Sequence, residues 1–353
     1  MKTKNNRAEQ LYSDILAVFT RKQHLDSVQV LLCLFLAAMG KPRPAYATVK
    51  SPAALSRFLN QYDWNTKAII RVMRHHTLSQ LQSYRKRCAG RPPRLELIVD
   101  LTSIGKEGDF LGLGDWIHTL NSVSGLHVVM LYLCCGEARI PWSFLIWRGK
   151  GEPSPTQLAL KLLRGLPKEV RQHSKTIHLL ADGGFCSKDF IRGVIALGFA
   201  GFVGMPADRK TSTGQQLRDI KTPGMQIELH DLSGIPLWVS WVWLPAKKGN
   251  EQEQRFIVST VPRSPQVIKR TGKRRWKIEA LFKTLKSRFG FGTFGQHSKR
   301  GVLRFLCISL LSFLLCHFAF LDRPNSGDSS LPHWGQLAQS VRHQFLAPIR
   351  LAE

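Results

Sequence analysis

The sequence predicts an α/β protein in which a helical N-terminal region precedes a core of strands and helices. Residues 1–94 contain helix-forming segments with little strand alternation. From residue 95 onward apolar strand patterns alternate with helical ones, and two of these strands lead into an aspartate. A strand-rich stretch over residues 205–262 separates this part from further helices. We therefore expect an α/β core with a β-strand insertion, preceded by an N-terminal helical domain.

The helical region is predicted from four segments and one clear helix start. Ser51 followed by Pro52 is typical of an N-cap with proline at the first helical position. The last two segments, joined by YDWN, loosely resemble a helix-turn-helix pair, so residues 1–94 are a candidate DNA-binding domain, with plain helical packing as the alternative. The segment RCAGRPPR, residues 87–94, is predicted to be a linker. The helical segments are EQLYSDILAVFTRKQ, DSVQVLLCLFLAAM, SPAALSRFLNQY and NTKAIIRVMRHHTLSQLQSYRKR.

The next part, residues 95–204, shows an element order typical of one fold. An apolar strand, RLELIVDLT, is expected to end in Asp100, and a hairpin is expected around Gly136-Glu137. A helix, a strand ending in Asp182, a second helix and a third strand then follow. Three antiparallel strands followed by helix, strand, helix and strand is the order of an RNase H-like α/β core. Since such sheets place their chemistry at strand ends, both aspartates are candidate site residues.

The rest of the chain divides into an insertion, a helical segment and a tail. Residues 205–262 carry the strand patterns MQIELHDL, PLWVSWVWL and RFIVSTV. Its tryptophans, of which Trp241 and Trp243 share a strand face, either stack on an unpaired base or form the core of the insertion. Residues 263–322 are predicted to be core helices, and residues 323–353 an irregular tail. The apolar run 305–321 is near the minimum length for a membrane span, but we expect a buried core helix.

The net charge indicates a polyanionic partner. The 51 Lys and Arg against 24 Asp and Glu leave a formal charge of +27 and a pI near 10.3. With 353 residues, 43% of them hydrophobic, the chain can bury a full core, so a globular body rather than a disordered tail carries this charge. Seven scattered cysteines lack zinc-ligand spacing, and the N-terminus lacks the apolar stretch of a signal peptide. We expect a cytoplasmic protein without structural zinc.

Glu279 stands out in the most basic segment. It is the only carboxylate in residues 262–304, where about a dozen Lys and Arg surround it. Phosphates explain the cations, and a metal ion beside those phosphates explains the acid. Arg275, Glu279 and Lys286 are spaced i, i+4 and i+11, which places them on one helical stripe with Lys283. The structural alternative is an ion pair within the helix.

Asp100, Asp182 and Glu279 together predict a metal-dependent phosphodiester site. Mg²⁺ prefers oxygen ligands, and two ions must flank both the attacking and the leaving oxygen. Each carboxylate is predicted at the end of an apolar strand or on a helix whose other face is apolar, so the three are expected to meet at one edge of the sheet.

Three short blocks resemble bacterial insertion-sequence transposases of the DDE type, in the class numbered four. Asp100-Leu101-Thr102 matches the first block, and Ala181-Asp182-Gly183-Gly184-Phe185 matches the second. RRWKIEALFKTLKSRFG resembles the third, which is Tyr, two residues, Arg, three residues, Glu, six residues, Lys. Arg275, Glu279 and Lys286 match it in register, and Gly272 stands where the family has tyrosine. The resemblance extends over roughly residues 95–321.

The resemblance implies a magnesium-dependent transposase with an RNase H-like core. Asp100, Asp182 and Glu279 would hold two Mg²⁺ ions, with Mn²⁺ as a possible substitute. The enzyme would cut double-stranded DNA at the inverted-repeat ends of its element and join the 3′-hydroxyls to target DNA, as a homodimer in the bacterial nucleoid. Arg275 and Lys286 would contact phosphates near the cut. The cations added to this groove from charge alone are Lys106, Lys273, Arg274, Lys277 and Lys283.

Three other functions stay open from the sequence. A catalytically inactive or domesticated DNA-binding derivative is suggested by the glycine in place of tyrosine. A structure-specific nuclease on the same core would share the metal chemistry without strand transfer. A protein anchored by residues 305–321, with its basic segments facing anionic lipid, is the third.

Overall fold

The computed structural model describes residues 6–37, 41–87, 93–106, 111–150, 153–244, 252–323 and 332–352. Most of the predicted linker, at residues 88–92, lies outside this part. Its helices are α1 (Arg7–Leu16), α2 (Lys22–Ala37), α3 (Pro52–Asn60), α4 (Thr66–Arg87), α5 (Pro155–Arg164), α6 (Lys168–Arg171), α7 (Lys188–Ala196), α8 (Pro265–Lys273), α9 (Lys277–Arg288), α10 (Lys299–Leu321) and α11 (Trp334–Leu346). Its strands are β1 (Leu95–Gly105), β2 (Ile117–Leu120), β3 (Val123–Cys135), β4 (Ala138–Trp147), β5 (His178–Ala181), β6 (Ala200–Met205), β7 (Gln226–Ile227), β8 (Leu237–Leu244) and β9 (Glu253–Ser259). The short 3-10 helices are η1 (Pro44–Tyr46), η2 (Leu111–Trp116), η3 (Gly183–Phe185), η4 (Leu217–Asp219) and η5 (Arg274–Trp276).

One mixed sheet forms the centre of the α/β part, as predicted. The described strands follow the order β2-β3-β1-β5-β6-β9-β8-β7, and β4 pairs with β3. β4, β3 and β1 are antiparallel, whereas β5 and β6 continue parallel to β1. The predicted hairpin at Gly136-Glu137 joins β3 to β4. This is the strand order expected of an RNase H-like core.

β1 is longer than predicted, so Asp100 lies inside the strand and not at its end. β3 is long enough to pair antiparallel with β1 from Leu95 through Gly105. The parallel partner β5 is shorter, and its last pair with β1 is Val99↔Ala181. Asp100 is therefore the first β1 residue beyond the parallel pairing, and Asp182 is the first residue beyond β5, as predicted.

The insertion continues the core sheet. β9 pairs antiparallel with β6, β8 with β9, and β7 with β8. The strand predicted over MQIELHDL is reduced to Gln226–Ile227, because turns occupy most of the chain before β8. Trp241 is buried against Phe256 with ring centroids 5.6 Å apart, whereas Trp243 is 56% exposed. Trp241 therefore belongs to the core of the insertion.

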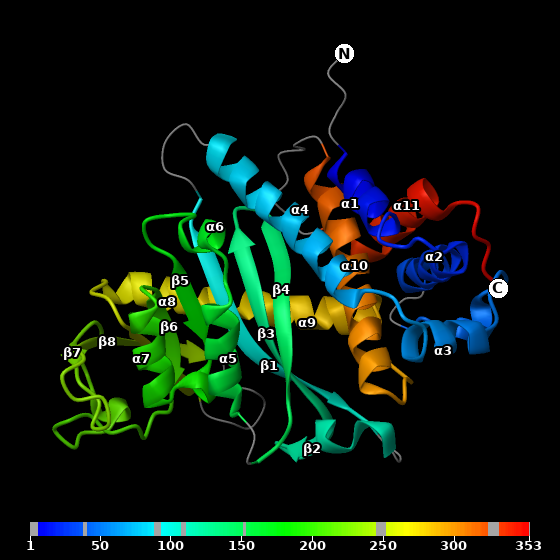
Figure 1. Cartoon of the computed structure of the whole chain (residues 1–353). Helices are drawn as coiled ribbons and strands as arrows, with labels where there is room; N and C mark the ends of the chain where they lie inside the picture. The colour runs from blue at the N-terminus through cyan, green and yellow to red at the C-terminus, as the bar shows by residue number, and fades with distance from the viewer. Residues whose placement is uncertain are drawn as a thin grey trace.

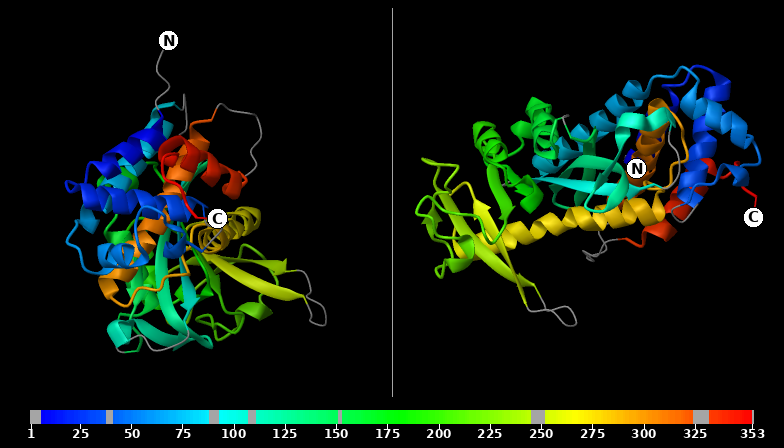
Figure 2. Two further views of the ribbon diagram at one scale, coloured as in Figure 1. Left: turned by 90° about the vertical axis from the view of Figure 1, so that its right-hand side faces the viewer. Right: turned by 90° about the horizontal axis from the view of Figure 1, so that it is seen from below.

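Helices cover the two faces of the sheet differently (Figures 1 and 2). α5 and α7 lie on one face. On the other, α8, η5 and α9 form one long helical rod, drawn in yellow, that runs across the strands from the insertion towards α10. This rod carries Glu279, so its path fixes where that residue meets the sheet.

The helical region is built from both ends of the chain. α10 packs against α1, α2, α3, α4 and α11 as well as β4. Asp322, directly after α10, accepts hydrogen bonds from the backbone N–H groups of Arg7 and Ala8 at the start of α1. The predicted division between residues 1–94 and 263–322 is thus not a packing boundary.

Two expectations about the C-terminal part have opposite outcomes. α10 is the helix, among the described residues, that is long and apolar enough to cross a membrane, but 89% of its apolar window is buried inside the protein. It is a core helix, as expected. The tail, in contrast, is not wholly irregular, since α11 packs against α2 and α10 through a buried apolar stripe that includes Leu337 and Val341.

Arg304 connects α10 to the α3–α4 turn from a position that is only 2% exposed. Its guanidinium donates to four backbone carbonyls and to the Thr66 hydroxyl and lies 4.0 Å from the centroid of the Trp64 ring. The carbonyls belong to Phe58, Leu59, Tyr62 and Trp64. Phe58 also accepts from the Trp64 indole N–H, and Trp64 from the Thr66 N–H, whereas the hydrogen bonds to Leu59 and Tyr62 come from Arg304. One side chain therefore stabilises the turn through several backbone carbonyls at once.

Replacing this residue should destabilise the protein strongly. Arg304→Met keeps the apolar stem but removes every donor, so the free energy of unfolding should fall by roughly 3 kcal/mol or more. Urea denaturation would measure this loss. The matched control is Arg300→Met on the same helix, at an exposed side chain, with an expected change within about 0.5 kcal/mol. Equal midpoints for the two variants would contradict the role given to Arg304.

Candidate active site

A pocket of about 910 Å³ lies where the carboxyl ends of β5 and β6 meet the helical rod and β9. Asp100, Asp182 and Glu279 all line it, so the fold brings the three predicted carboxylates to one cavity. Its other lining residues from the sheet are Leu101, Ala181, Phe202, Gly204, Met205, Val242, Leu244, Glu253, Gln254, Arg255, Phe256 and Ile257. The loops and the rod add Gly183, Gly184, Pro206, Ala207, Gly272, Lys273, Arg275, Trp276 and Phe282.

The two aspartates lie on neighbouring strands and differ in exposure. Asp100 is 7% exposed, and one of its oxygens accepts from the N–H of Leu101 at 2.8 Å. Asp182 is half-buried and caps η3, with Oδ1 accepting from the N–H of Gly184 at 2.9 Å. In each aspartate only Oδ1 accepts one of these backbone hydrogen bonds, and Oδ2 does not.

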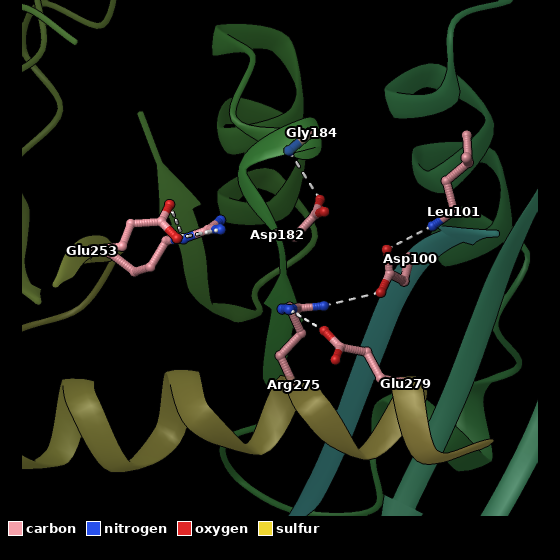
Figure 3. A network of polar contacts seen from close by, with 8 residues as sticks. Asp100, Leu101, Asp182, Gly184, Glu253, Arg275 and Glu279 are labelled. Carbon is pink, nitrogen blue, oxygen red and sulfur yellow. Dashed lines mark hydrogen bonds and ion pairs between the residues drawn. The ribbon is translucent and has the colours of Figure 1, made fainter. Parts of the chain in front are cut away.

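Arg275 lies between the first and third carboxylates (Figure 3). Its guanidinium donates to Asp100 Oδ2 at 3.0 Å and to Glu279 Oε1 at 2.6 Å. The expected ion pair within the helix is therefore present, and the same cation also reaches across to β1. The Glu279 side chain is 56% exposed, whereas Arg275 is 18% exposed. This half-buried cation links the rod to the sheet.

The electrostatics around Asp100 are unfavourable to its charge. Burial and the neighbouring Asp182 raise the pKa of Asp100 to about 7, although Arg275 opposes the shift. A carboxylate with a raised pKa beside a second carboxylate is a site short of positive charge. Arg275 supplies part of that charge.

The donor set has the chemistry of a hard divalent cation. Asp100, Asp182 and Glu279 offer carboxylate oxygens, and an ion beside them would relieve the repulsion that raises the Asp100 pKa. In the described part of the chain, however, no three Asp, Glu, His or Cys side chains are grouped closely enough to hold an ion as they stand. The Arg275 bridge separates Glu279 from the aspartates, so joint ligation requires that bridge to open.

Of the cations predicted to contact DNA, only some face this pocket. Arg275 and Lys273 line it, and Lys283 is exposed on the rod. Arg274 and Lys277 point elsewhere, because both pair with the buried Glu96 of β1. Sequence spacing placed all five on one helix but gave no sign of Glu96 as a partner.

Lys106 and Lys286 hold the protein's own backbone. Lys286 Nζ donates to the carbonyl of Ser103 at 2.9 Å, and Lys106 Nζ donates to the carbonyls of Gly292 and Phe294. Burial lowers the pKa of both lysines. Their ammonium groups tie β1 to α9 and to the loop after it. The phosphate contacts predicted for these two lysines stay predictions.

Three pocket residues were not predicted from the sequence. Glu253 and Arg255 on β9 form an exposed ion pair at the far wall. Trp276, in η5, is 39% exposed and lines the pocket, whereas the apolar residues Ile278, Phe282 and Leu285 that follow it on α9 are buried. A Glu and an Arg two residues apart on a strand are too common in proteins to indicate a functional site.

Gly272, at the position where the resembled family has tyrosine, packs closely against the inserted strand β9. A Cβ built at this position would lie 2.5 Å from Cδ1 of Ile257 on β9. The rod therefore approaches the inserted strand more closely at this point than any side chain allows unless Ile257 moves.

The raised pKa of Asp100 predicts how stability depends on pH. Because the folded pKa of about 7 exceeds the unfolded value of 3.8, the associated stability is complete below pH 4 and is lost as pH rises through 7. With a chelator present, the free energy of unfolding of Asp100→Asn at pH 8 should therefore exceed that of the wild type by about 2 kcal/mol. The difference should shrink toward pH 4.

The control for this measurement is Asp208→Asn, at an exposed carboxylate. It should follow the wild-type profile at every pH. An Asp100→Asn profile parallel to the wild type from pH 4 to 8 would contradict the raised pKa.

Lys286 should contribute to stability, in contrast to Lys283 on the same helix. Lys286→Met removes a half-buried donor and leaves the Ser103 carbonyl unsatisfied, so the free energy of unfolding should fall by about 1–3 kcal/mol. Lys283→Met, at an exposed side chain, should change it by less than about 0.5 kcal/mol. Denaturant titration would measure both variants. If both variants lowered the free energy of unfolding equally, the hydrogen bond from Lys286 to the Ser103 carbonyl would not stabilise the fold.

Comparison with known proteins identifies the family. Residues 91–315 match the family described as Transposase DDE domain, which is more than half of the chain. The search of curated proteins finds no match.

Among solved structures, the protein is similar to that of a cryo-EM piggyBac transposase synaptic complex with hairpin DNA. The similarity has a TM-score of 0.54 at 11% identity and covers 98% of this chain and 77% of that one. It shows that the fold is shared, and supports the RNase H-like assignment of the core. The mixed sheet, the three carboxylates on one pocket and the matched domain together show that this chain belongs to the DDE transposase family.

Proposed function

We propose that this protein is a DNA transposase that cuts at the ends of its element and joins the freed 3′-hydroxyls to target DNA. The observation that carries the proposal is the convergence of Asp100, Asp182 and Glu279 on one pocket in a chain of net charge +27. Membership of the DDE transposase family supports it. The similar piggyBac structure holds hairpin DNA, which makes duplex ends the substrate to test.

In this proposal Asp100, Asp182 and Glu279 hold divalent ions, with Mg²⁺ as the natural ion and Mn²⁺ as a substitute. When bound, two such ions would activate the attacking hydroxyl and stabilise the leaving oxygen of an in-line displacement. Glu279 is suited to ligation because its side chain is exposed on the rod while its backbone is fixed by the buried face of α9.

Arg275 would change partners when the site fills. If Asp100 and Glu279 held a divalent ion, they would no longer need the positive charge of this guanidinium, and the donors of Arg275 would be available to a phosphate of the bound strand. Lys273 and Trp276 lie at the same wall of the pocket, where an ammonium group and an exposed ring suit a DNA strand. These residues position the strand, and no covalent enzyme intermediate is required.

The proposal includes a homodimer on DNA and a location at the bacterial nucleoid. Two transposon ends must be processed together for the element to move, and a dimer presents two equivalent pockets. An inactive DNA-binding derivative is the second candidate, favoured by Gly272 in place of the family tyrosine. Packing against Ile257 gives that glycine a structural reason, so the glycine does not by itself indicate an inactive protein.

Cleavage and joining of transposon ends is the direct test. Purified protein would be incubated with Mg²⁺ and a labelled duplex that carries the inverted repeats flanking its gene, beside Glu279→Ala and Asp182→Asn. The wild type should give nicked, hairpin or joined products, and both variants should lose at least about 100-fold in rate, because each lacks a metal ligand. Their DNA affinity should stay within about threefold of the wild type, because neither loses a phosphate contact.

The outcomes separate the candidates. Cleavage without joining would indicate a nuclease. End binding without cleavage, in Mn²⁺ as well as Mg²⁺, would indicate the inactive derivative. Undiminished cleavage by Asp182→Asn would rule out the proposed site.

A further inference from the structure

A second polar cleft, of about 560 Å³, lies on the other flank of the helical rod. Its rod residues are Arg270, Arg274 and Lys277, spaced i, i+4 and i+7, which places them on one stripe. Arg275 and Glu279, which line the carboxylate pocket, lie on the opposite stripe. The two cavities have no lining residue in common. The remaining lining residues of the cleft are Pro93, Arg94, Glu96, Cys134 and Gly136.

The cleft contains four cationic side chains and one carboxylate. Glu96 is buried on β1, and its two oxygens accept separately from Arg274 Nη1 at 2.5 Å and from Lys277 Nζ at 2.6 Å. These two cations hold the pKa of Glu96 below its ordinary value, although its burial acts in the opposite direction. Arg270 is exposed and has no ion pair among the described residues. The lining is thus strongly positive, because two of its four cations pair with the Glu96 carboxylate and the other two add further positive charge.

Glu96 holds Arg274 and Lys277 in place but leaves both side chains partly exposed to solvent. The Arg274 side chain is 37% exposed and that of Lys277 is 30% exposed, so each retains donors that reach the solvent. Holding a flexible cation in place beforehand reduces the entropy lost when an anion binds. A guanidinium fork beside an ammonium group suits phosphate oxygens. The cleft therefore has the chemistry of a prepared phosphate site.

We propose that this cleft binds a second stretch of DNA backbone, separate from the strand at the carboxylates. The inference rests on the proposed function, because the same rod carries Glu279 and so DNA that reaches the pocket passes beside the cleft. Phosphates on both flanks of one rigid rod would fix the register of the duplex against the cutting site. Arg270, Arg274 and Lys277 bind this second stretch, and Glu96 is a positioning residue.

The salt dependence of DNA binding tests the cleft. The affinity of a duplex carrying the inverted repeats would be measured by fluorescence anisotropy across NaCl concentrations, with a chelator present. Each phosphate contact contributes about 0.9 to the slope of log affinity against log salt. The double variant Arg270→Ala/Lys277→Gln should therefore lower the slope by roughly 2 and weaken binding about tenfold or more at 0.1 M salt.

The matched control removes two cations from the opposite face of the sheet. Lys161→Ala/Arg164→Ala on α5 changes the net charge equally and should leave the slope within about 0.3 of the wild type. The single variant Arg270→Ala alters only an exposed side chain, so a fall of about 1 in slope would occur without any effect on folding. Thermal unfolding of each variant would show that the fold is kept.

The results separate this inference from the proposed function. A wild type that does not bind the duplex would overturn both. If the wild type binds and cuts but the cleft variants keep its slope, the cleft is not a DNA site and the proposed function stands. A slope that falls equally in the α5 control would also overturn the inference, because the effect would then reflect overall charge.

Discussion

The site depends on the parallel pairing of β1 with β5, because that pairing determines which residues lie side by side where the paired segment ends. The register Val99↔Ala181 is the last step of the ladder, and the next residue on each strand is an aspartate. The apolar side chains before this step are fully buried, and a shift of one residue would turn them to the wrong face of the sheet. Core packing thus fixes the separation of the two carboxylates, although neither contributes to the core.

Cations then fasten the helical rod to β1. Along that one strand, Glu96 pairs with Arg274 and Lys277, Asp100 with Arg275, and the Ser103 carbonyl accepts from Lys286. The attachment points follow the strand in the same direction as the rod, so rotation of the rod would break several of them at once. Several basic residues that suggest DNA contacts in the sequence therefore also hold the rod against the sheet.

Local patterns in the sequence predicted most of the fold, because strands and helices of this protein have clear periods. Asp182 at the end of β5, the β3–β4 hairpin and the buried α10 all follow from apolar runs and turn residues. The full length of β1 could not be predicted, since it depends on how far β3 extends as a partner. The same is true of the continuous sheet formed by β6 and β9, which joins distant segments.

The candidate site was predictable in its residue types but not in its pairings. The three carboxylates were found from spacing and from the isolation of Glu279 among cations. Whether Lys286 and Lys106 face solvent or a backbone carbonyl depends on the path of neighbouring chains, which a single helix pattern does not contain. Glu96 was missed for the same reason, since a buried acid in an apolar strand shows its purpose only when its partners are known.

The enclosure of α10 by segments from both ends of the chain has a consequence for synthesis. α1 and α2 leave the ribosome first, yet the helix against which they pack and the carboxylate of Asp322 that caps α1 follow about 300 residues later. At ordinary rates of translation this interval is roughly 15–60 s. During it, α2 can pack against α3 but lacks its partners on α10 and α11, so the early part of the chain is only partly folded. The last helices to be made, α10 and α11, are therefore the ones that complete the packing around α1 and α2.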